Sequence, residues 1–177
     1  SSGSADSLYL LLIFGAGFAL LGWLDDHRRK SVLFRLSIQI ALSLAFISAV
    51  QIKNSGATVA WWECLALALA MVWHVNLFNF MDGADGFAGT HALTVTLGIA
   101  GLGFYQNTNF TAEWGICVGG AVAGYLWWNW SPARVFMGDS GSYFLGFHLA
   151  AIVILSHGSQ TVPFLILLAP FVVDATL

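Results

Sequence analysis

The segment 76–86 holds the most chemically distinctive residues of the chain, because asparagine, aspartate and glycine recur there directly after an apolar run. Asn76, Asn79, Asp82 and Asp85 are spaced three residues apart. On a helix this spacing would place the four side chains along one slowly drifting stripe. Carboxylate and amide groups in an apolar setting cost free energy unless they are hydrogen-bonded, paired or bound to a cation. We therefore expect a polar ligand or a cation at this stripe, and we interpret Asn76 as a helix-packing residue.

A second acidic motif ends the first apolar run, where Asp25 and Asp26 stand just before Arg28, Arg29 and Lys30. Carboxylates at the C-terminus of a helix oppose the helix dipole and need compensation. Two interpretations remain open at this point. The turn is either a solvated one neutralised by its basic neighbours, or a place where a cation or a proton donor binds.

The third motif is the segment 136–142, Phe-Met-Gly-Asp-Ser-Gly-Ser, which puts Asp139 and Ser142 at the start of a later apolar run. Its acid could simply cap that helix, and the turn 82–86 could likewise be an ordinary turn followed by a cap. However, glycines beside acids also let the backbone approach a ligand and offer N–H groups to an anion. Three such motifs in one chain favour a shared site.

The composition places the chain in a membrane. Hydrophobic residues make up 58% of the sequence and charged residues only 8%, whereas soluble proteins carry about 25% charged residues. The net charge of -3 and the absence of a long basic run argue against a nucleic-acid partner.

Seven apolar runs can be marked, and most approach the length of roughly 17 to 25 residues that a membrane-spanning helix needs. They are 8–24, 32–52, 61–81, 87–105, 114–130, 141–156 and 161–173. No run shows sustained alternation of polar and apolar residues, so the sequence predicts an all-α, polytopic transmembrane helical bundle of about seven spans. We treat residues 1–177 as a single integral membrane domain and expect the N- and C-terminal parts of a longer parent to be missing. Gly120 and Gly124 predict close helix packing.

The loops predict the orientation. If the basic turn after Asp26 is cytoplasmic, alternation of the spans puts five of the six basic residues on that side. The same alternation brings six of the nine acids to the cytoplasmic face, namely Asp25, Asp26, Asp82, Asp85, Asp139 and Asp174. The second, fourth and sixth helices would begin there, with their positive dipole ends toward an anion. Carboxylates, oriented N–H groups and basic residues together predict metal-assisted chemistry on a phosphorylated ligand, with Mg²⁺ as the hard cation.

These motifs resemble a known family. Leu24-Asp25-Asp26, the segment 76–86 and the segment 132–142 are similar, in order and roughly in spacing, to the motifs of the polyprenyl-phosphate N-acetylhexosamine-1-phosphate transferases. That family includes the muramoyl-pentapeptide transferase of peptidoglycan synthesis and the enzymes that initiate O-antigen and teichoic-acid synthesis. The segment 128–133, Trp-Asn-Trp-Ser-Pro-Ala, looks more like the O-antigen-initiating branch.

The resemblance implies transfer of a sugar 1-phosphate from a UDP-N-acetylhexosamine to undecaprenyl or another polyprenyl phosphate, with release of UMP. It implies Mg²⁺ as the cofactor, with Mn²⁺ as the alternative, and a bundle of roughly ten or eleven helices in the bacterial cytoplasmic membrane. The implied roles are metal binding for Asp139 and Asn79, nucleotide binding for Asp82, Asp85 and Phe136, and handling of the lipid phosphate for Asp25 and Asp26. A homodimer is left open. The family's basic, glycine-rich loop before the first run and its histidine-rich loop after the last run are not in this sequence.

The rival function is a transporter or channel that couples intramembrane acids to cations or protons. Such acids should lie near the middle of the bilayer. The acids of this chain instead cluster at the ends of the apolar runs, which favours an enzyme at the membrane surface.

Overall fold

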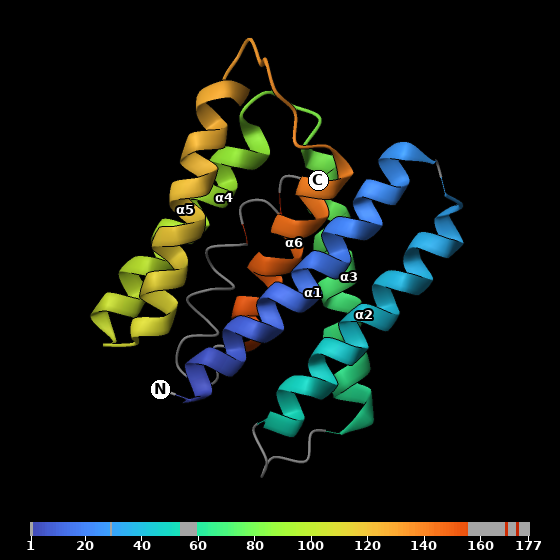
Figure 1. The fold of residues 1–177 in the computed structure, drawn as a ribbon, viewed down its shortest axis with the longest axis vertical. Helices are drawn as coiled ribbons and strands as arrows, with labels where there is room; N and C mark the ends of the chain where they lie inside the picture. The colour runs from blue at the N-terminus through green and yellow to red at the C-terminus, as the bar shows by residue number, and fades with distance from the viewer. Residues whose placement is uncertain (1, 29, 54–59, 156–168, 170–172, 174–177) are drawn as a thin grey trace. The chain divides into compact units, whose positions relative to one another are not determined.

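The computed structural model describes residues 2–28, 30–53 and 60–155, together with the single positions 169 and 173. Within these residues α-helices joined by turns and irregular segments are the secondary structure, and there is no strand (Figure 1). The helices are α1 (Ser2–His27), α2 (Val32–Lys53), α3 (Trp61–Met81), α4 (Phe87–Tyr105), α5 (Asn109–Asn129) and α6 (Gly138–Leu155). The predicted run 161–173 lies outside the described residues, apart from those two positions.

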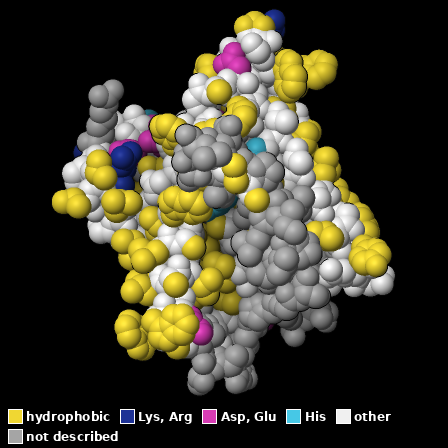
Figure 2. Space-filling view, turned by 180° about the vertical axis from the view of Figure 1, so that it is seen from behind, with side chains coloured by type: hydrophobic (Ala, Val, Ile, Leu, Met, Phe, Trp, Pro, Cys, Tyr) yellow, Lys and Arg dark blue, Asp and Glu magenta, His cyan; other side chains and the backbone are white. Residues whose placement is uncertain are grey.

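Five of these helices are long and apolar enough to cross a membrane, and α5 is the one that does not qualify. Every 18-residue stretch of α5 contains the charged residue Glu113, which lowers its mean hydropathy. Large hydrophobic side chains are exposed along the helices, among them Ile13, Leu33 and Phe80. Figure 2 shows such side chains over much of the visible face, with few charged ones between them. The structure confirms the predicted all-helical polytopic membrane protein.

The chain divides into two compact units, which are described separately. The first comprises residues 1–79 and 138–151, and so contains α1, α2, nearly all of α3 and most of α6. The second comprises residues 80–137 and 152–177, and contains α4, α5 and the segments that flank them. The single membrane domain expected from the sequence stays a prediction.

The first unit has an aromatic core. The ring of Phe18 on α1 stacks on that of Phe147 on α6 at 4.9 Å between centroids, and Phe46 on α2 meets Phe147 edge-on at 5.2 Å. All three rings are fully buried. These contacts join helices that are distant in sequence, so they fix where the ends of α1 and α6 lie.

Helix α3 joins the same unit through a polar contact. The side chain of Asn76 donates a 2.6 Å hydrogen bond to Oε1 of Gln39 on α2, and another of 2.7 Å to the carbonyl oxygen of Val72. Even a partly buried amide needs such partners in an apolar bundle. The predicted packing role of Asn76 is confirmed.

The second unit depends on glycines where α4 packs against α5. A Cβ on Gly103 would stand 2.5 Å from the backbone nitrogen of Ala112, and a Cβ on Gly115 would stand 2.6 Å from the carbonyl oxygen of Thr96. The prediction of close packing at Gly120 and Gly124 is wrong for the part of the chain that the structure describes, where nothing lies within 4 Å of the Cβ position of either residue. Gly119, the residue before Gly120, lies against the side chain of Thr96 on α4. Because each residue turns a helix by about 100°, Gly120 and Gly124 point to other sides of α5.

Candidate active site

Three of the predicted site residues meet in the first unit. Asp25 and Asp26 at the end of α1 and Asp139 in the first turn of α6 line one cleft, together with Lys30 and Arg35. The cleft has a volume of about 400 Å³. Its three carboxylates face two basic side chains, which leaves one formal negative charge. The first and third sequence motifs therefore form a single charged site at helix ends.

Asp25 is held on both of its carboxylate oxygens. Nη1 of Arg35 on α2 contacts Oδ2 at 2.5 Å, and the backbone N–H of Lys30 donates to Oδ1 at 2.9 Å. The Asp25 side chain is only 6% exposed and Arg35 is 29% exposed, so the ion pair is partly shielded from water. Together these contacts fasten the turn between α1 and α2.

The sequence analysis missed this role of Arg35, although a signal was available. Arg35 lies inside the apolar run 32–52, and a charged residue within a membrane-spanning segment is a candidate functional residue by itself.

Asp26 receives two backbone N–H groups from α6. Its Oδ1 accepts from the backbone nitrogen of Asp139 at 3.1 Å, and its Oδ2 accepts from that of Ser140 at 3.3 Å. The N–H groups of the first turn of a helix have no partner within the helix, and a carboxylate there also suits the positive end of the helix dipole. Asp26 therefore acts as an N-cap supplied by another helix.

Asp139 is linked to the second sequence motif through Asn79. The side-chain nitrogen of Asn79 donates to Oδ1 of Asp139 at 2.6 Å and to Oγ of Ser142 at 3.1 Å. The carboxyl groups of Asp139 and Asp25 line the same cleft. Two neighbouring carboxyl groups are stable only when a proton, a cation or a basic side chain separates their charges. This arrangement makes the cleft suited to a cation.

The donor set of the cleft fits Mg²⁺. Within residues 2–28, 30–53 and 60–155, no three His, Cys, Asp or Glu side chains are grouped so that they could hold a metal ion among themselves. Mg²⁺ does not need such a cage, because it usually keeps several waters and is bound by one or two carboxylates plus phosphate oxygens of a substrate. Asp139 offers the hard carboxylate oxygens that this mode of binding requires, and the adjoining Asn79 side chain carries an amide oxygen beside the nitrogen that donates to Asp139.

The remaining predicted residues, Asp82, Asp85 and Phe136, belong to the second unit. The expected helical stripe is wrong beyond Asn79, because α3 ends at Met81 and Asp82 and Asp85 lie in the turn that follows. Gly86 ends this turn with φ of 71°, a left-handed conformation that glycine adopts most readily. The helix cannot continue through this glycine-rich turn.

Asn129 holds this turn against the segment after α5. Its side-chain oxygen accepts from the backbone N–H of Gly86, and its side-chain nitrogen donates to the carbonyl oxygen of Val135, both at 2.9 Å. Oδ2 of Asp85 accepts from the backbone N–H of Ala133 at 3.0 Å. Asn129 is 2% exposed. The sequence analysis missed Asn129, although a signal was available: an asparagine between two tryptophans at the end of an apolar run needs hydrogen-bond partners.

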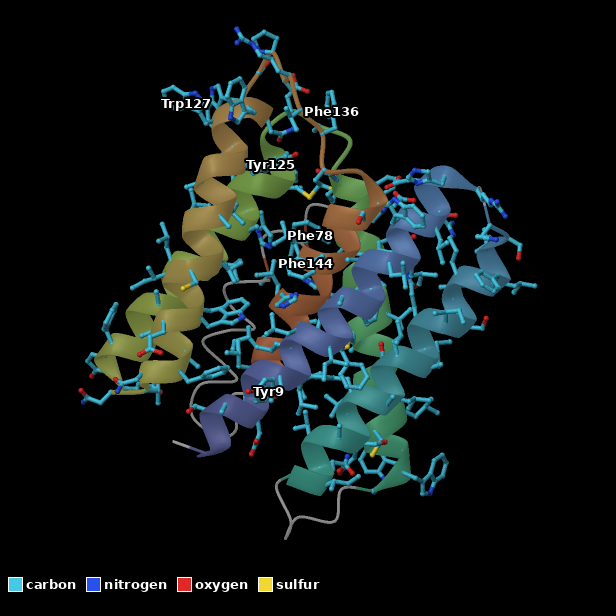
Figure 3. The ribbon with its side chains drawn as sticks, viewed as in Figure 1. Tyr9, Phe78, Tyr125, Trp127, Phe136 and Phe144 are labelled. Atoms are coloured by element: carbon cyan, nitrogen blue, oxygen red, sulfur yellow. The ribbon has the colours of Figure 1, made fainter. Side chains whose placement is uncertain are left out.

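Phe136 is available for stacking. The residue is 60% exposed, and Figure 3 shows it on the segment between α5 and α6, with Trp127 at the end of α5. The second unit thus combines an exposed aromatic ring with a hydrogen-bonded turn that carries Asp82 and Asp85. A nucleobase can be recognised by stacking on an aromatic ring and by hydrogen bonds to carboxylate oxygens. The first unit offers the charge pattern for phosphate chemistry.

Residues 8–157 match the family model described as glycosyl transferase family 4. The phospho-N-acetylmuramoyl-pentapeptide-transferase of Heliobacterium modesticaldum is 31% identical over 176 residues, which cover 88% of this chain and 55% of the relative. The protein of the same name from Bacillus pumilus is 32% identical over 168 residues, covering 84% of this chain and 52% of the relative.

A relative of the same name from Picosynechococcus is 32% identical over 158 residues, covering 78% of this chain and 43% of its own length. The chain thus spans about half the length of the curated relatives that it matches. The matched region includes all three sequence motifs and the residues described above in each unit.

Proposed function

Because this chain belongs to glycosyl transferase family 4, we propose that its protein transfers an N-acetylhexosamine 1-phosphate from a UDP-sugar to a polyprenyl phosphate. The products are a polyprenyl-diphosphate sugar and UMP. The reaction takes place at the cytoplasmic face of a bacterial inner membrane, where the product starts a cell-wall or O-antigen polysaccharide.

The cleft in the first unit is the observation that carries this proposal. It joins Asp25 and Asp26 from one end of the sequence to Asp139 from the other, and adds the positive charges of Lys30 and Arg35. These acids lie in the last turn of α1 and the first turn of α6, and not at the middle of a helix. That placement supports chemistry at a membrane surface more than ion transport through the bilayer.

The acceptor phosphate would be oriented by the cleft. A phosphate monoester loses its second proton with a pKa of about 6, so a lipid phosphate is mostly dianionic at neutral pH and needs little help from a base. We propose direct attack of its oxygen on the sugar-bearing phosphorus, so that a new P–O bond forms as the bond to UMP breaks. Arg35 and Lys30 would attract the anion, and Asp25 would hold Arg35 in place.

Asp139 and Asn79 would hold Mg²⁺, which when bound supplies neutralisation of the charge on the transferring phosphoryl group. The chain's own contribution is to place the Asp139 carboxylate beside the cleft. The hydrogen bond from Asn79 and the contacts at the start of α6 achieve this placement.

We assign recognition of the uridine to the second unit. The exposed ring of Phe136 would stack on the base, and Asp85 would accept a hydrogen bond from it. Asp82 would line the same nucleotide site. Asn129 would keep the turn and the Phe136 segment together, since it bonds to the backbone of both. Mn²⁺ as an alternative metal and a homodimer stay predictions.

The experiment uses the complete purified protein with undecaprenyl phosphate, Mg²⁺ and a panel of donors. The panel contains UDP-N-acetylglucosamine, UDP-N-acetylgalactosamine and UDP-N-acetylmuramoyl-pentapeptide, and mass spectrometry measures both UMP and the lipid product. We expect UMP and a lipid diphosphate sugar in equal amounts with one donor. If no donor gives UMP, while the protein in liposomes passes cations or protons, the transporter function replaces this one.

A phosphoenzyme assay separates the two reaction routes. Direct attack predicts that no labelled phosphate stays on the protein when a donor labelled in the sugar-bearing phosphate is added without acceptor. A phosphorylated aspartate trapped under these conditions would replace direct attack by a two-step route.

A further inference from the structure

We propose that Asp26 is a positioning residue: it seats the first turn of α6 on α1 and thereby sets the place of Asp139. The importance of that place rests on the function proposed above for Asp139. Asp26 itself then contacts neither the acceptor nor the donor, in contrast to the role that the family resemblance implies for it.

The carboxylate of Asp26 is occupied by backbone. One oxygen accepts from the N–H of Asp139 and the other from the N–H of Ser140, at 3.1 and 3.3 Å. These are two of the N–H groups that α6 cannot satisfy within itself. Asp25, the neighbouring acid, differs because it binds the α1–α2 turn and Arg35 and makes no such contact with the α6 backbone.

A stripe on α1 is shaped to receive α6. Ala19, Gly22 and Asp26 are three and four residues apart and so lie on one face of the helix. The hydroxyl of Ser140 donates to the carbonyl oxygen of Ala19 at 3.0 Å. At Gly22 the two backbones approach so closely that a Cβ there would overlap the carbonyl group of Asp139, and would stand 2.6 Å from Cα of Ser140. The contact is therefore made backbone to backbone.

Gly138 completes the junction. Its φ is 63°, a conformation that side chains disfavour, and a Cβ on it would stand 3.0 Å from Oδ2 of Asp26. Glycine at this position lets the chain turn into α6 while the Asp26 carboxylate remains against the N–H groups of Asp139 and Ser140. Every element of this junction fixes the backbone of Asp139, the residue to which we assign the metal.

Hydrogen exchange tests the junction without any substrate. The complete protein is placed in lipid nanodiscs, and mass spectrometry follows the amides of peptides covering 138–142. Because loss of an N-cap raises local opening, we expect exchange in Asp26→Ala to be at least about threefold faster. Asp26→Asn, which keeps one acceptor oxygen, should give a smaller increase. Asp6→Asn on the exposed part of α1 is the matched control and should leave these amides unchanged.

Two glycine variants on α1 test the same junction without changing a charge. Gly22→Ala puts a methyl group into the backbone of Asp139, whereas a Cβ on Gly17 would meet only the end of the Leu42 side chain, at 3.2 Å. In the UMP assay we expect Gly22→Ala to lower kcat by about tenfold or more, because a shift of about 1 Å in a reacting group has such effects. Its KM for the UDP-sugar should stay within about twofold, because the nucleotide is recognised elsewhere. Gly17→Ala should match the unmodified protein in both constants.

The outcomes separate this proposal from the proposed function. If the unmodified protein releases no UMP with any donor, the proposed function fails, and the exchange experiment still decides whether Asp26 seats α6. If the amides of residues 138–142 exchange in Asp26→Ala as fast as in the unmodified protein, but the variant no longer releases UMP, Asp26 takes part in the reaction and the positioning proposal is wrong. Should Asp26→Ala not fold, Asp26→Asn decides in its place: unchanged exchange there, with Gly22→Ala as active as Gly17→Ala, also overturns the proposal.

Discussion

Asn79 and Asp139 are joined by a 2.6 Å hydrogen bond from the side-chain amide to Oδ1, although they lie on different helices, α3 and α6. The same amide group reaches Ser142 one turn further along α6. This hydrogen bond holds the carboxylate of Asp139 in one orientation, although Asp25 and Asp26 line the same cleft. The bond gives the second sequence motif a direct part in the charged cleft.

Replacing Asn79 should weaken metal binding. Asn79→Ala removes the group that orients Asp139, and loss of such a supporting partner typically costs about 10- to 100-fold in metal affinity or activity. We expect the Mg²⁺ concentration for half-maximal UMP release to rise by about tenfold or more. The measurement is a Mg²⁺ titration of the complete protein at saturating donor and acceptor. Asn109→Ala, at the start of α5, is the control, and an unchanged titration for Asn79→Ala would remove Asn79 from the metal site.

Asp139 should be essential for turnover but not for folding. Asp139→Asn keeps the backbone N–H that Asp26 accepts and keeps the size of the side chain, but removes its charge. We expect Mg²⁺-dependent UMP release to be lost, with helix content by circular dichroism and elution in size-exclusion chromatography unchanged. Unaltered turnover in this variant would show that the metal assignment is wrong.

The helices were accessible from the sequence because long apolar runs bounded by polar turns determine them. The predicted run 87–105 matches α4 at both ends, and 61–81 matches α3. The error at Gly120 and Gly124 has a geometric cause, since spacing alone does not tell which face of a helix meets a neighbour. Only the position of α4 shows that Gly103 and Gly115 make that contact.

The sequence also indicated which residues form the site, but it did not show which groups these residues contact. Polar spacing singled out Asp25, Asp26 and Asp139, and the cleft brings these three together. What the sequence could not show is that Asp25 and Asp26, adjacent in the chain, turn to different partners: the first to Arg35, the second to the backbone of α6. Neighbouring residues on a helix point about 100° apart, and only tertiary packing decides what each one meets.

The ion pair of Arg35 with Asp25 should stabilise the first unit. Arg35→Ala leaves a carboxylate that is only 6% exposed without its charged partner. Because Arg35 itself is partly solvated, we expect a loss of about 1–3 kcal/mol in the free energy of unfolding. Thermal or denaturant unfolding of the complete protein in detergent measures it. Arg35→Lys should lose less, and the double variant Arg35→Ala with Asp25→Ala should recover part of the loss; strictly additive losses would mean that the pair does not interact.

The packing of α4 on α5 should depend on Gly115. The Cβ of Gly115→Ala would stand 2.6 Å from the carbonyl oxygen of Thr96 and 2.7 Å from the backbone nitrogen of Ala100. Backbone atoms cannot move aside as side chains do, so overpacking should cost about 1–3 kcal/mol. Gly120→Ala on the same helix meets nothing within 4 Å among the described residues and should be neutral or slightly stabilising. Unfolding curves of the two variants make the comparison, and equal stability would place the contact elsewhere on α5.

Asp85 should govern affinity for the nucleotide and leave use of the lipid intact. Its carboxylate lies in the turn that Asn129 joins to the Phe136 segment. Asp85→Ala removes a charged acceptor, and such hydrogen bonds contribute about 1.5–3 kcal/mol, which corresponds to a rise of about 10- to 150-fold in the Kd for UDP. Isothermal titration calorimetry with UDP measures it, and Glu113→Gln on α5 is a control remote from the turn. If Asp85→Ala binds UDP with unchanged affinity but no longer uses polyprenyl phosphate, the assignments of the nucleotide site and the lipid site are the wrong way round.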